Sequence, residues 1–341
     1  MTKAPTSKHR KTPATKSAKA VATERFDVHQ HVTDQIIKAL EAGTKPWEQP
    51  WRSAGGSLRP LRFNGEPYRG INVVMLWGAS QERGFVSPYW MTFQQALELG
   101  GCVRKGERGS KVVKAGQSVF GDQDAPDKEG SGQGEAEDGG AVRRWLKAYT
   151  VFNSEQIDGL PERYAVKAVE PGPLPERLAS ADAFFANIPA KVINSGERAF
   201  YRISTDDIHM PPLDLFKDAE HHAATLAHEL VHWTRHPSRL DRDFGRKAFG
   251  DEGYAKEECC AELGAAFVGA ILGLRPSHIE DHAAYIGSWL KVLKNDKRFI
   301  FTAAGHAQRA VDLLESYQPG AAVAQSRRVD GGENEVQERA A

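Results

Sequence analysis

Two histidines and a glutamate stand in the sequence at a spacing that suits a metal ion. His228 and His232 are four residues apart, so on an α-helix both imidazoles point the same way and can reach one Zn²⁺ ion. Glu229 lies beside them and can act as the catalytic general base on a water molecule. The pattern predicts metal-assisted hydrolysis. The plain alternative is a helix with two solvated histidines, so the surrounding sequence has to decide.

The segment 228–232 is an HExxH motif, the arrangement found in metallopeptidases. A catalytic zinc needs a third protein ligand and an open position. On the next predicted helix, Glu258 and Glu262 are one turn apart, so the first can ligate the metal while the second accepts the outward N–H of a ligating histidine. This order of helices resembles the glutamate-type zincins, and the resemblance favours Glu258 over Glu257. The expected cofactor is Zn²⁺, with Mn²⁺ or another divalent metal as the alternative.

Peptide hydrolysis also needs a group that stabilises the developing oxyanion. His282 and Tyr285, on a helix predicted over residues 279–293, are candidate catalytic donors, although lone residues on a helix are more often structural. Residues 206–211, predicted as an edge strand just before the histidine helix, are suited to hold an extended peptide by strand addition.

Other elements must position these residues. Asp218 is suited to cap the start of the histidine helix, and Pro237 marks its end. Apolar spacing predicts further helices over residues 254–272 and 302–317 that pack around it. With helices and short strands mixed along 341 residues, the sequence predicts an α+β protein of two domains, the second mainly helical with a small sheet.

Composition divides the chain further. We expect a disordered basic arm, a first domain with an acidic, glycine-rich and disordered hairpin insertion, a Pro-rich linker, a second domain and a disordered tail. The expected boundaries are residues 1–22, 23–165 (insertion 121–140), 166–178, 179–318 and 319–341.

Charge and cysteine usage exclude some classes of protein. The formal net charge is zero, so only local charge can indicate a partner. No apolar run is long enough to span a bilayer, and the N-terminus is rich in Lys, Thr and Pro without an apolar signal core, so we expect a cytoplasmic protein without a membrane partner. Cys259 and Cys260 are adjacent, which suits a reducing compartment, and we interpret them as small helix residues.

Cations and aromatic rings alternate in the first half, a mixture that is typical of proteins that bind single strands. The alternative is that most of these rings belong to the core. The candidate DNA-binding residues are Trp47, Trp51 and Tyr68 for base stacking, and Arg69, Arg104, Lys105, Arg108 and Lys111 for phosphate.

Motifs along nearly the whole chain resemble the ArdC-type antirestriction proteins. The matching segments are residues 34–37, 46–51, 67–72, 103–107 and 151–157 in the first half, and 228–234, 257–264 and 282–290 in the second. The resemblance implies an N-terminal domain that binds single-stranded DNA and a C-terminal zincin-like metallopeptidase domain. It also implies carriage on plasmids or other mobile elements, whose incoming DNA the protein protects from host restriction.

This resemblance leaves the reaction open. The expected partners are single-stranded DNA and an unidentified protein substrate or partner. One candidate for that protein is a component of the host restriction system. The first alternative is a non-catalytic module that shields DNA, contacts proteins and holds a structural metal. The second is a free-standing metallopeptidase. The acidic insertion and the Cys259-Cys260 pair depart from the family pattern without touching the proposed ligands.

Overall fold

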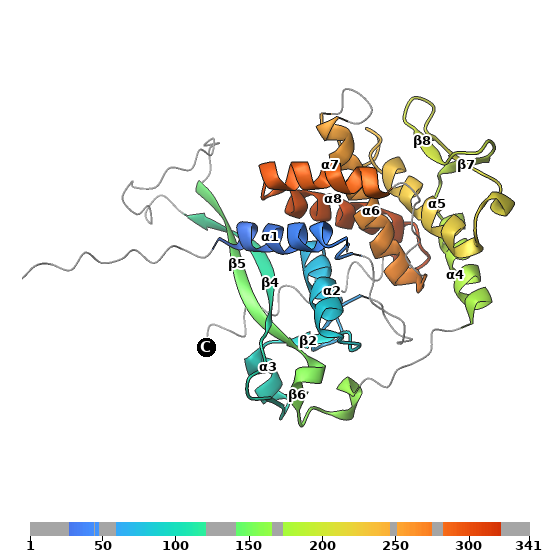
Figure 1. Ribbon diagram of the computed structural model, residues 1–341. Coiled ribbons are helices and arrows are strands. Elements are labelled where there is room, and N and C mark those ends of the chain that lie inside the picture. The colour runs from blue at the N-terminus through green and yellow to red at the C-terminus, as the bar shows by residue number, and fades with distance from the viewer. Residues whose placement is uncertain are drawn as a thin grey trace, which may run out of the picture.

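The computed structural model has an α+β architecture, as the sequence predicts (Figure 1). It describes residues 27–43, 45–47, 59–120, 141–165, 173–245, 251–274 and 282–321, with the backbone alone at 117–120, 141–144 and 282–285. The N-terminal half combines a long hairpin with helices, and the C-terminal half is mainly helical with a small sheet. The predicted arm and insertion lie outside the described residues, as does the predicted tail from residue 322 onward.

Two helices line the N-terminal half. α1 (Val28–Glu41) begins at Asp27, whose side chain accepts a hydrogen bond from the backbone N–H of Gln30, and it buries its apolar stripe. Gly43 ends it with a φ of 75°, a left-handed conformation that favours glycine. α2 (Ile71–Arg83) ends at Gly84 in the same conformation.

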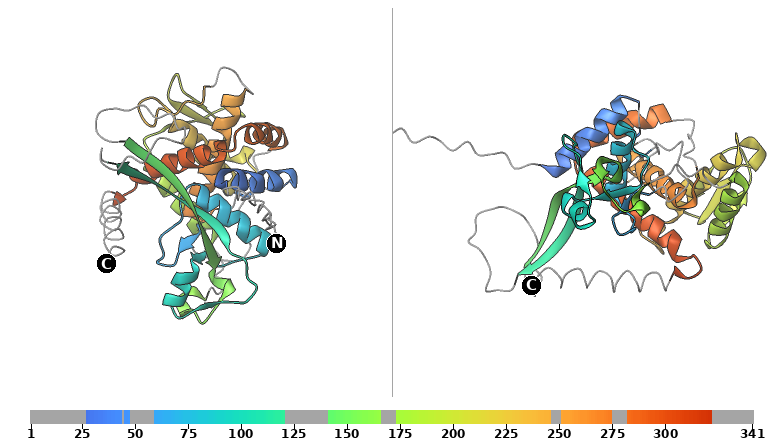
Figure 2. Two further views of the ribbon diagram at one scale, coloured as in Figure 1. Left: turned by 90° about the vertical axis from the view of Figure 1, so that its left-hand side faces the viewer. Right: turned by 90° about the horizontal axis from the view of Figure 1, so that it is seen from below.

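A four-stranded sheet forms the rest of this half, in the order β1-β2-β5-β4. β1 (Leu61–Arg62) and β2 (Tyr89–Met91) are short, whereas β4 (Ser110–Phe120) and β5 (Ala141–Asn153) form the long hairpin that runs across the front in the left view of Figure 2. The smaller elements at one end are α3 (Phe93–Glu98), β3 (Cys102–Val103), η1 (Ser154–Gln156), β6 (Ile157–Asp158) and η2 (Glu162–Tyr164). β3 and β6 pair with each other as a second small sheet.

The C-terminal half begins with α4 (Leu174–Ala186), which starts inside the segment predicted as linker because Pro175 fits the first turn of a helix. The sheet that follows has the order β7-β9-β8, formed by β7 (Lys191–Asn194), β9 (Asp207–Met210) and β8 (Phe200–Arg202). β9 is therefore the central strand. The prediction of an edge strand at residues 206–211 is wrong, because β7, which the sequence did not reveal, pairs with β9 on one side while β8 pairs on the other.

Four helices complete the fold after the short η3 (Leu213–Leu215). They are α5 (Ala219–Trp233), α6 (Glu252–Leu272), α7 (His282–Asn295) and α8 (Phe299–Ser316). α6 is buried along most of its length and packs against both α5 and α8. No helix in the described ranges combines the length and the apolar character that a membrane span needs.

The two halves share a hydrophobic core. One apolar cluster contains buried residues from both, and aromatic pairs join them. Trp47 meets Trp289 with ring centroids 5.6 Å apart, and Trp77 meets Phe267 at 5.8 Å. Since edge-to-face and tilted ring contacts of this kind add to the burial of the rings themselves, the halves stabilise each other.

Gly264 sets how closely α6 approaches α5. A Cβ at this position would lie 2.6 Å from a methyl carbon of Val231, a distance that side chains do not tolerate. We therefore expect Gly264→Ala to lower the free energy of unfolding by about 1–3 kcal/mol through overpacking. Gly269→Ala is the matched control, because its Cβ would meet only the Leu274 carbonyl oxygen at an ordinary 3.7 Å. Urea denaturation of both variants would check the difference, and equal midpoints would contradict it.

Candidate metal centre

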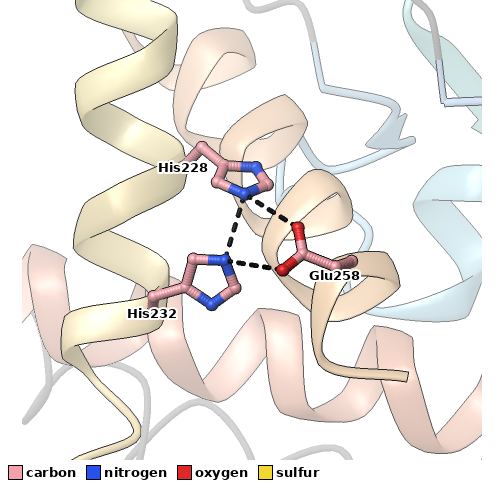
Figure 3. A group of neighbouring side chains, drawn as sticks. All are labelled: His228, His232 and Glu258. Atoms are coloured by element: carbon pink, nitrogen blue, oxygen red, sulfur yellow. Dashed lines mark hydrogen bonds and ion pairs between the residues drawn. The ribbon is translucent and has the colours of Figure 1, made fainter. Parts of the chain in front are cut away.

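Three side chains that suit a metal ion meet where α5 faces α6. Asp218 caps α5 by accepting a hydrogen bond from the backbone N–H of His221, as predicted, and the helix turns His228 and His232 toward α6. Glu258 comes from α6 and points its carboxylate at both imidazoles (Figure 3). The nearest ligand atoms of these three residues all lie within 4.8 Å of one another. The structure thus brings together the three residues that the sequence proposed as ligands.

The spacing of the three ligands fits a small divalent cation. The two Nε2 atoms are 3.1 Å apart, and the carboxylate oxygens of Glu258 lie 3.5 Å from Nε2 of His228 and 3.6 Å from Nε2 of His232. Ligands about 2.0–2.1 Å from a tetrahedral zinc are about 3.3 Å from each other, so each of these distances is close to that between two ligands of one ion. The imidazole of His228 faces Oε2 of Glu258, and that of His232 faces Oε1. The fourth position of a tetrahedral site is left for water or substrate.

The electrostatics of this group favour a cation. Burial lowers the pKa of His232, but the carboxylates of Glu258 and Glu257 outweigh burial and raise that pKa to about 10. The pKa of His228 is raised as well, against its burial, chiefly by Glu258. Burial raises the pKa of Glu258, yet the two imidazoles hold it far below its usual range. Ionised carboxylates around two imidazoles thus create a site that positive charge stabilises.

Glu229 provides a carboxylate oxygen that nothing else uses. The side chain is 6% exposed, and within the described part of the chain its Oε2 atom is buried without a hydrogen-bond partner. A buried carboxylate oxygen without a partner is costly, so such an atom calls for an explanation. Its place next to His228 on α5 suits an oxygen that accepts a proton from a water molecule or substrate.

Glu257 supports the histidines in the way predicted for Glu262, so the prediction for Glu262 is wrong. The Nδ1 atom of His232 lies 2.9 Å from Oε1 of Glu257 and donates to it, which fixes the ring with Nε2 toward Glu258. Adjacent residues on a helix diverge by about 100°, so the two carboxylates lie on two sides of the imidazole. Glu262 lies a turn farther along α6, and neither histidine hydrogen-bonds to it.

Arg242 holds Glu257 in place, although no sequence pattern indicated this role. Its guanidinium is fully buried and donates to both oxygens of Glu257, at 2.7 and 2.8 Å. It also donates to the Val231 carbonyl oxygen at 2.8 Å and to the Thr234 hydroxyl at 3.0 Å. Although burial raises the pKa of Glu257, Arg242 and then His232 lower it to about 2. The loop after α5 thus locks a charged carboxylate behind His232.

The comparisons with known proteins agree with this architecture. Residues 26–152 match the family of the N-terminal domain of anti-restriction factor ArdC, and residues 179–306 match the zincin-like metallopeptidase family. A crystal structure of the metal-free antirestriction ArdC protein from plasmid R388 is 48% identical, with a TM-score of 0.71, over 87% of this chain and 98% of that one. The chain belongs to the ArdC family. The Mn(II)-bound crystal structure of the R388 protein is also 48% identical, with a TM-score of 0.69, over 86% of this chain and 98% of that one.

The ArdC architecture also occurs in other sequences. The uncharacterized protein y4eC of Sinorhizobium fredii is 38% identical over 297 residues, which cover 86% of this chain and 94% of that protein. A DNA primase TraC of Escherichia coli is 38% identical over 306 residues, which cover 85% of this chain and 27% of the primase. The chain therefore spans about a quarter of that primase.

Two aromatic residues proposed to stack on DNA bases are core residues of the ArdC fold. Trp47 is 2% exposed and packs on Trp289, and Tyr68 is 8% exposed beneath Arg62. Burial also raises the pKa of Tyr68 to about 12. Both predictions are wrong, because these rings are buried in the core. The neighbouring Pro and Arg residues suggested exposed loops, but they do not report on packing between distant segments. Trp51, the third candidate, lies outside the described residues.

The cations proposed for phosphate contact divide into two groups. Arg69 pairs with Asp312 of α8, and Arg104 binds Glu107 at 2.8 Å and Asp158 at 3.3 Å, so both already have acidic partners within the protein. Lys105 and Arg108 are exposed, and Lys111 donates to the Thr150 hydroxyl at 2.8 Å. Lys105 and Arg108 are therefore the exposed candidates without an acidic partner among the described residues, whereas Arg69 and Arg104 each have one.

Two further predictions concern the helices around the site. His282 and Tyr285, the candidate oxyanion donors, begin α7, but their side chains lie outside the described residues. Cys259 and Cys260 are fully buried free thiols in α6, as expected for small helix residues. Burial raises the pKa of Cys260 to about 12, so its thiol stays protonated and inert.

Proposed function

We propose that this ArdC family member binds single-stranded DNA through its N-terminal half and cleaves a protein substrate at the His228/His232/Glu258 centre. In this proposal the two activities together protect the incoming DNA of a mobile element from host restriction. The proposed substrate is a protein of the host restriction system. The proposed cofactor is Zn²⁺ or Mn²⁺, and the Mn(II)-bound structure of the R388 relative supports a divalent ion.

One observation carries the proposal for the reaction. The Nε2 atoms of His228 and His232 lie 3.1 Å apart, and each lies 3.5 or 3.6 Å from one carboxylate oxygen of Glu258. The partnerless oxygen of Glu229 belongs to the residue next to the first ligand. A structural metal needs four protein ligands and no base beside them. Three ligands with an adjacent carboxylate instead suit a site that leaves one position for the reacting groups.

The residues then have distinct roles. A divalent metal held by the three ligands supplies a Lewis acid for the peptide carbonyl and acidifies water. Glu229 accepts the proton of the attacking water on its carboxylate and passes it to the nitrogen of the leaving amine. Glu257 holds the His232 ring by accepting the Nδ1–H bond, so that Nε2 keeps its lone pair toward Glu258.

Glu229→Gln tests the catalytic role. The variant keeps the size of the side chain but removes the base, so we expect protection of incoming DNA to fall to the level of a strain without the protein. Metal content and DNA binding should stay at wild-type values. Glu252→Gln, an identical change at an exposed carboxylate of α6, is the control and should protect fully. Undiminished protection by Glu229→Gln would instead favour a non-catalytic module that shields DNA.

Salt dependence tests the DNA half of the proposal. If cations bind phosphates, the logarithm of the association constant for single-stranded DNA should fall linearly with the logarithm of salt concentration, by about 0.7 for each phosphate contacted. The measurement needs the full chain, because the two halves share one core. Fluorescence anisotropy with a labelled oligonucleotide at several salt concentrations gives the slope. A slope of zero would contradict recognition led by phosphate.

A further inference from the structure

The two strands of the β4–β5 hairpin carry positively charged residues and no acidic ones. β4 contributes Lys111 and Lys114, β5 contributes Arg143, Arg144 and Lys147, and neither strand contains Asp or Glu. The hairpin lies at the front of the molecule in the left view of Figure 2, away from the metal centre between α5 and α6. A basic surface on a protein whose net charge is zero attracts a polyanion locally.

Two lysines face each other directly on this hairpin. Lys114 of β4 is the register partner of Lys147 of β5, so the two side chains lie on the same face of the hairpin. Both are exposed, and within the described ranges neither has a carboxylate partner. Like charges opposite each other destabilise a sheet. A phosphate bound between them would remove this repulsion.

Aromatic rings flank the lysine pair on the same face. Tyr149 and Trp145 are two residues to either side of Lys147 on β5, and strand residues that are two apart share a face. Tyr149 is 41% exposed. The ring of Trp145 covers Gly116, where a Cβ would come within 2.2 Å of it, and the Lys147 ammonium lies 5.1 Å from that ring. The face thus presents a ring, a pair of cations and a second ring in sequence.

We propose that Lys114, Lys147, Tyr149 and Trp145 form the surface on which a single strand of nucleic acid binds. The lysines bind its phosphates, the Tyr149 ring stacks on an unpaired base on one side of them, and Trp145 borders the surface on the other side. This inference rests on the proposed binding of single-stranded DNA and locates it. It also moves the site away from Trp47 and Tyr68, which are buried, and from Arg69 and Arg104, which have acidic partners.

The test measures anisotropy of a fluorescein-labelled oligothymidylate with the full chain across a salt series. We expect K114Q/K147Q to weaken binding at low salt and to make the salt slope shallower by about 1.4, since each contact to a single strand contributes about 0.7. Y149A should weaken binding by about 5- to 100-fold, and Y149F, which keeps the ring, should bind like the wild type. K217Q/K291Q removes two exposed lysines from the C-terminal half and should change neither affinity nor slope.

The outcomes separate this inference from the function on which it rests. If the wild-type chain does not bind the oligonucleotide, the DNA half of the proposed function fails. If the wild type binds and K114Q/K147Q and Y149A bind equally well with the same slope, only the location is overturned. Thermal melting of K114Q/K147Q should equal or exceed that of the wild type, because a repulsive pair is removed. A lower melting temperature would show that the lysines stabilise the hairpin and would contradict the inference.

Discussion

The variant with alanine at both His228 and His232 is expected to bind no stoichiometric Zn²⁺ or Mn²⁺, whereas the wild-type chain should bind about one ion. The reason is geometric. Two of the three ligand atoms are lost, and Glu258 alone leaves a hydrated ion with no advantage over any surface carboxylate. Elemental analysis of purified protein after dialysis against the metal gives the ratio directly, and the thermal shift on adding metal gives a second measure.

The matched control is a variant that also loses two histidines of α5, but not the candidate ligands. His221 and His222 stand at the start of the same helix, α5, where Asp218 contacts the first and Phe216 the second. We expect His221→Ala/His222→Ala to bind metal like the wild type. A His228→Ala/His232→Ala variant that retains a full equivalent of metal would refute the metal centre and, with it, the proposed reaction.

Replacement of Arg242 by leucine is expected to lower the free energy of unfolding by about 3–5 kcal/mol. Breaking a buried ion pair from one side leaves an uncompensated charge, here the carboxylate of Glu257, which is 2% exposed. The change also removes the donors to the Val231 carbonyl and the Thr234 hydroxyl. Chemical denaturation of the metal-free protein measures the loss, and metal affinity should fall about 10- to 100-fold because His232 loses its fixed orientation.

A double variant distinguishes the charge from the packing. Arg242→Leu/Glu257→Gln removes both charges, so we expect it to be more stable than Arg242→Leu alone, although it still lacks the guanidinium hydrogen bonds. Stabilities that simply add would mean that the two residues are independent, which would contradict their two hydrogen bonds of 2.7 and 2.8 Å. An Arg242→Leu variant that is as stable as the wild type would also contradict a stabilising ion pair between Arg242 and Glu257.

Two residues that were expected at the surface, Trp47 and Tyr68, lie in the core. Trp47 and Tyr68 stand beside proline or arginine, a context typical of loops, yet both are buried. Trp47 is covered by Trp289, which lies more than two hundred residues away in the sequence. Local patterns cannot reveal contacts between distant segments, because such burial depends on how the two halves pack. The facing of Lys114 and Lys147 was hidden from the sequence for the same reason, since it depends on the register of two strands.

The sequence by itself determined the α+β architecture, the helix that carries the histidines, its Asp218 cap and the three candidate ligands His228, His232 and Glu258, which the structure brings together. Helical spacing alone turns His228 and His232 to one side of α5. Only the tertiary structure decided that Glu257, rather than Glu262, supports His232 and that Arg242 secures Glu257. Helical periodicity shows which residues share a face of one helix, but the height and rotation at which α6 meets α5 depend on contacts such as Gly264 against Val231.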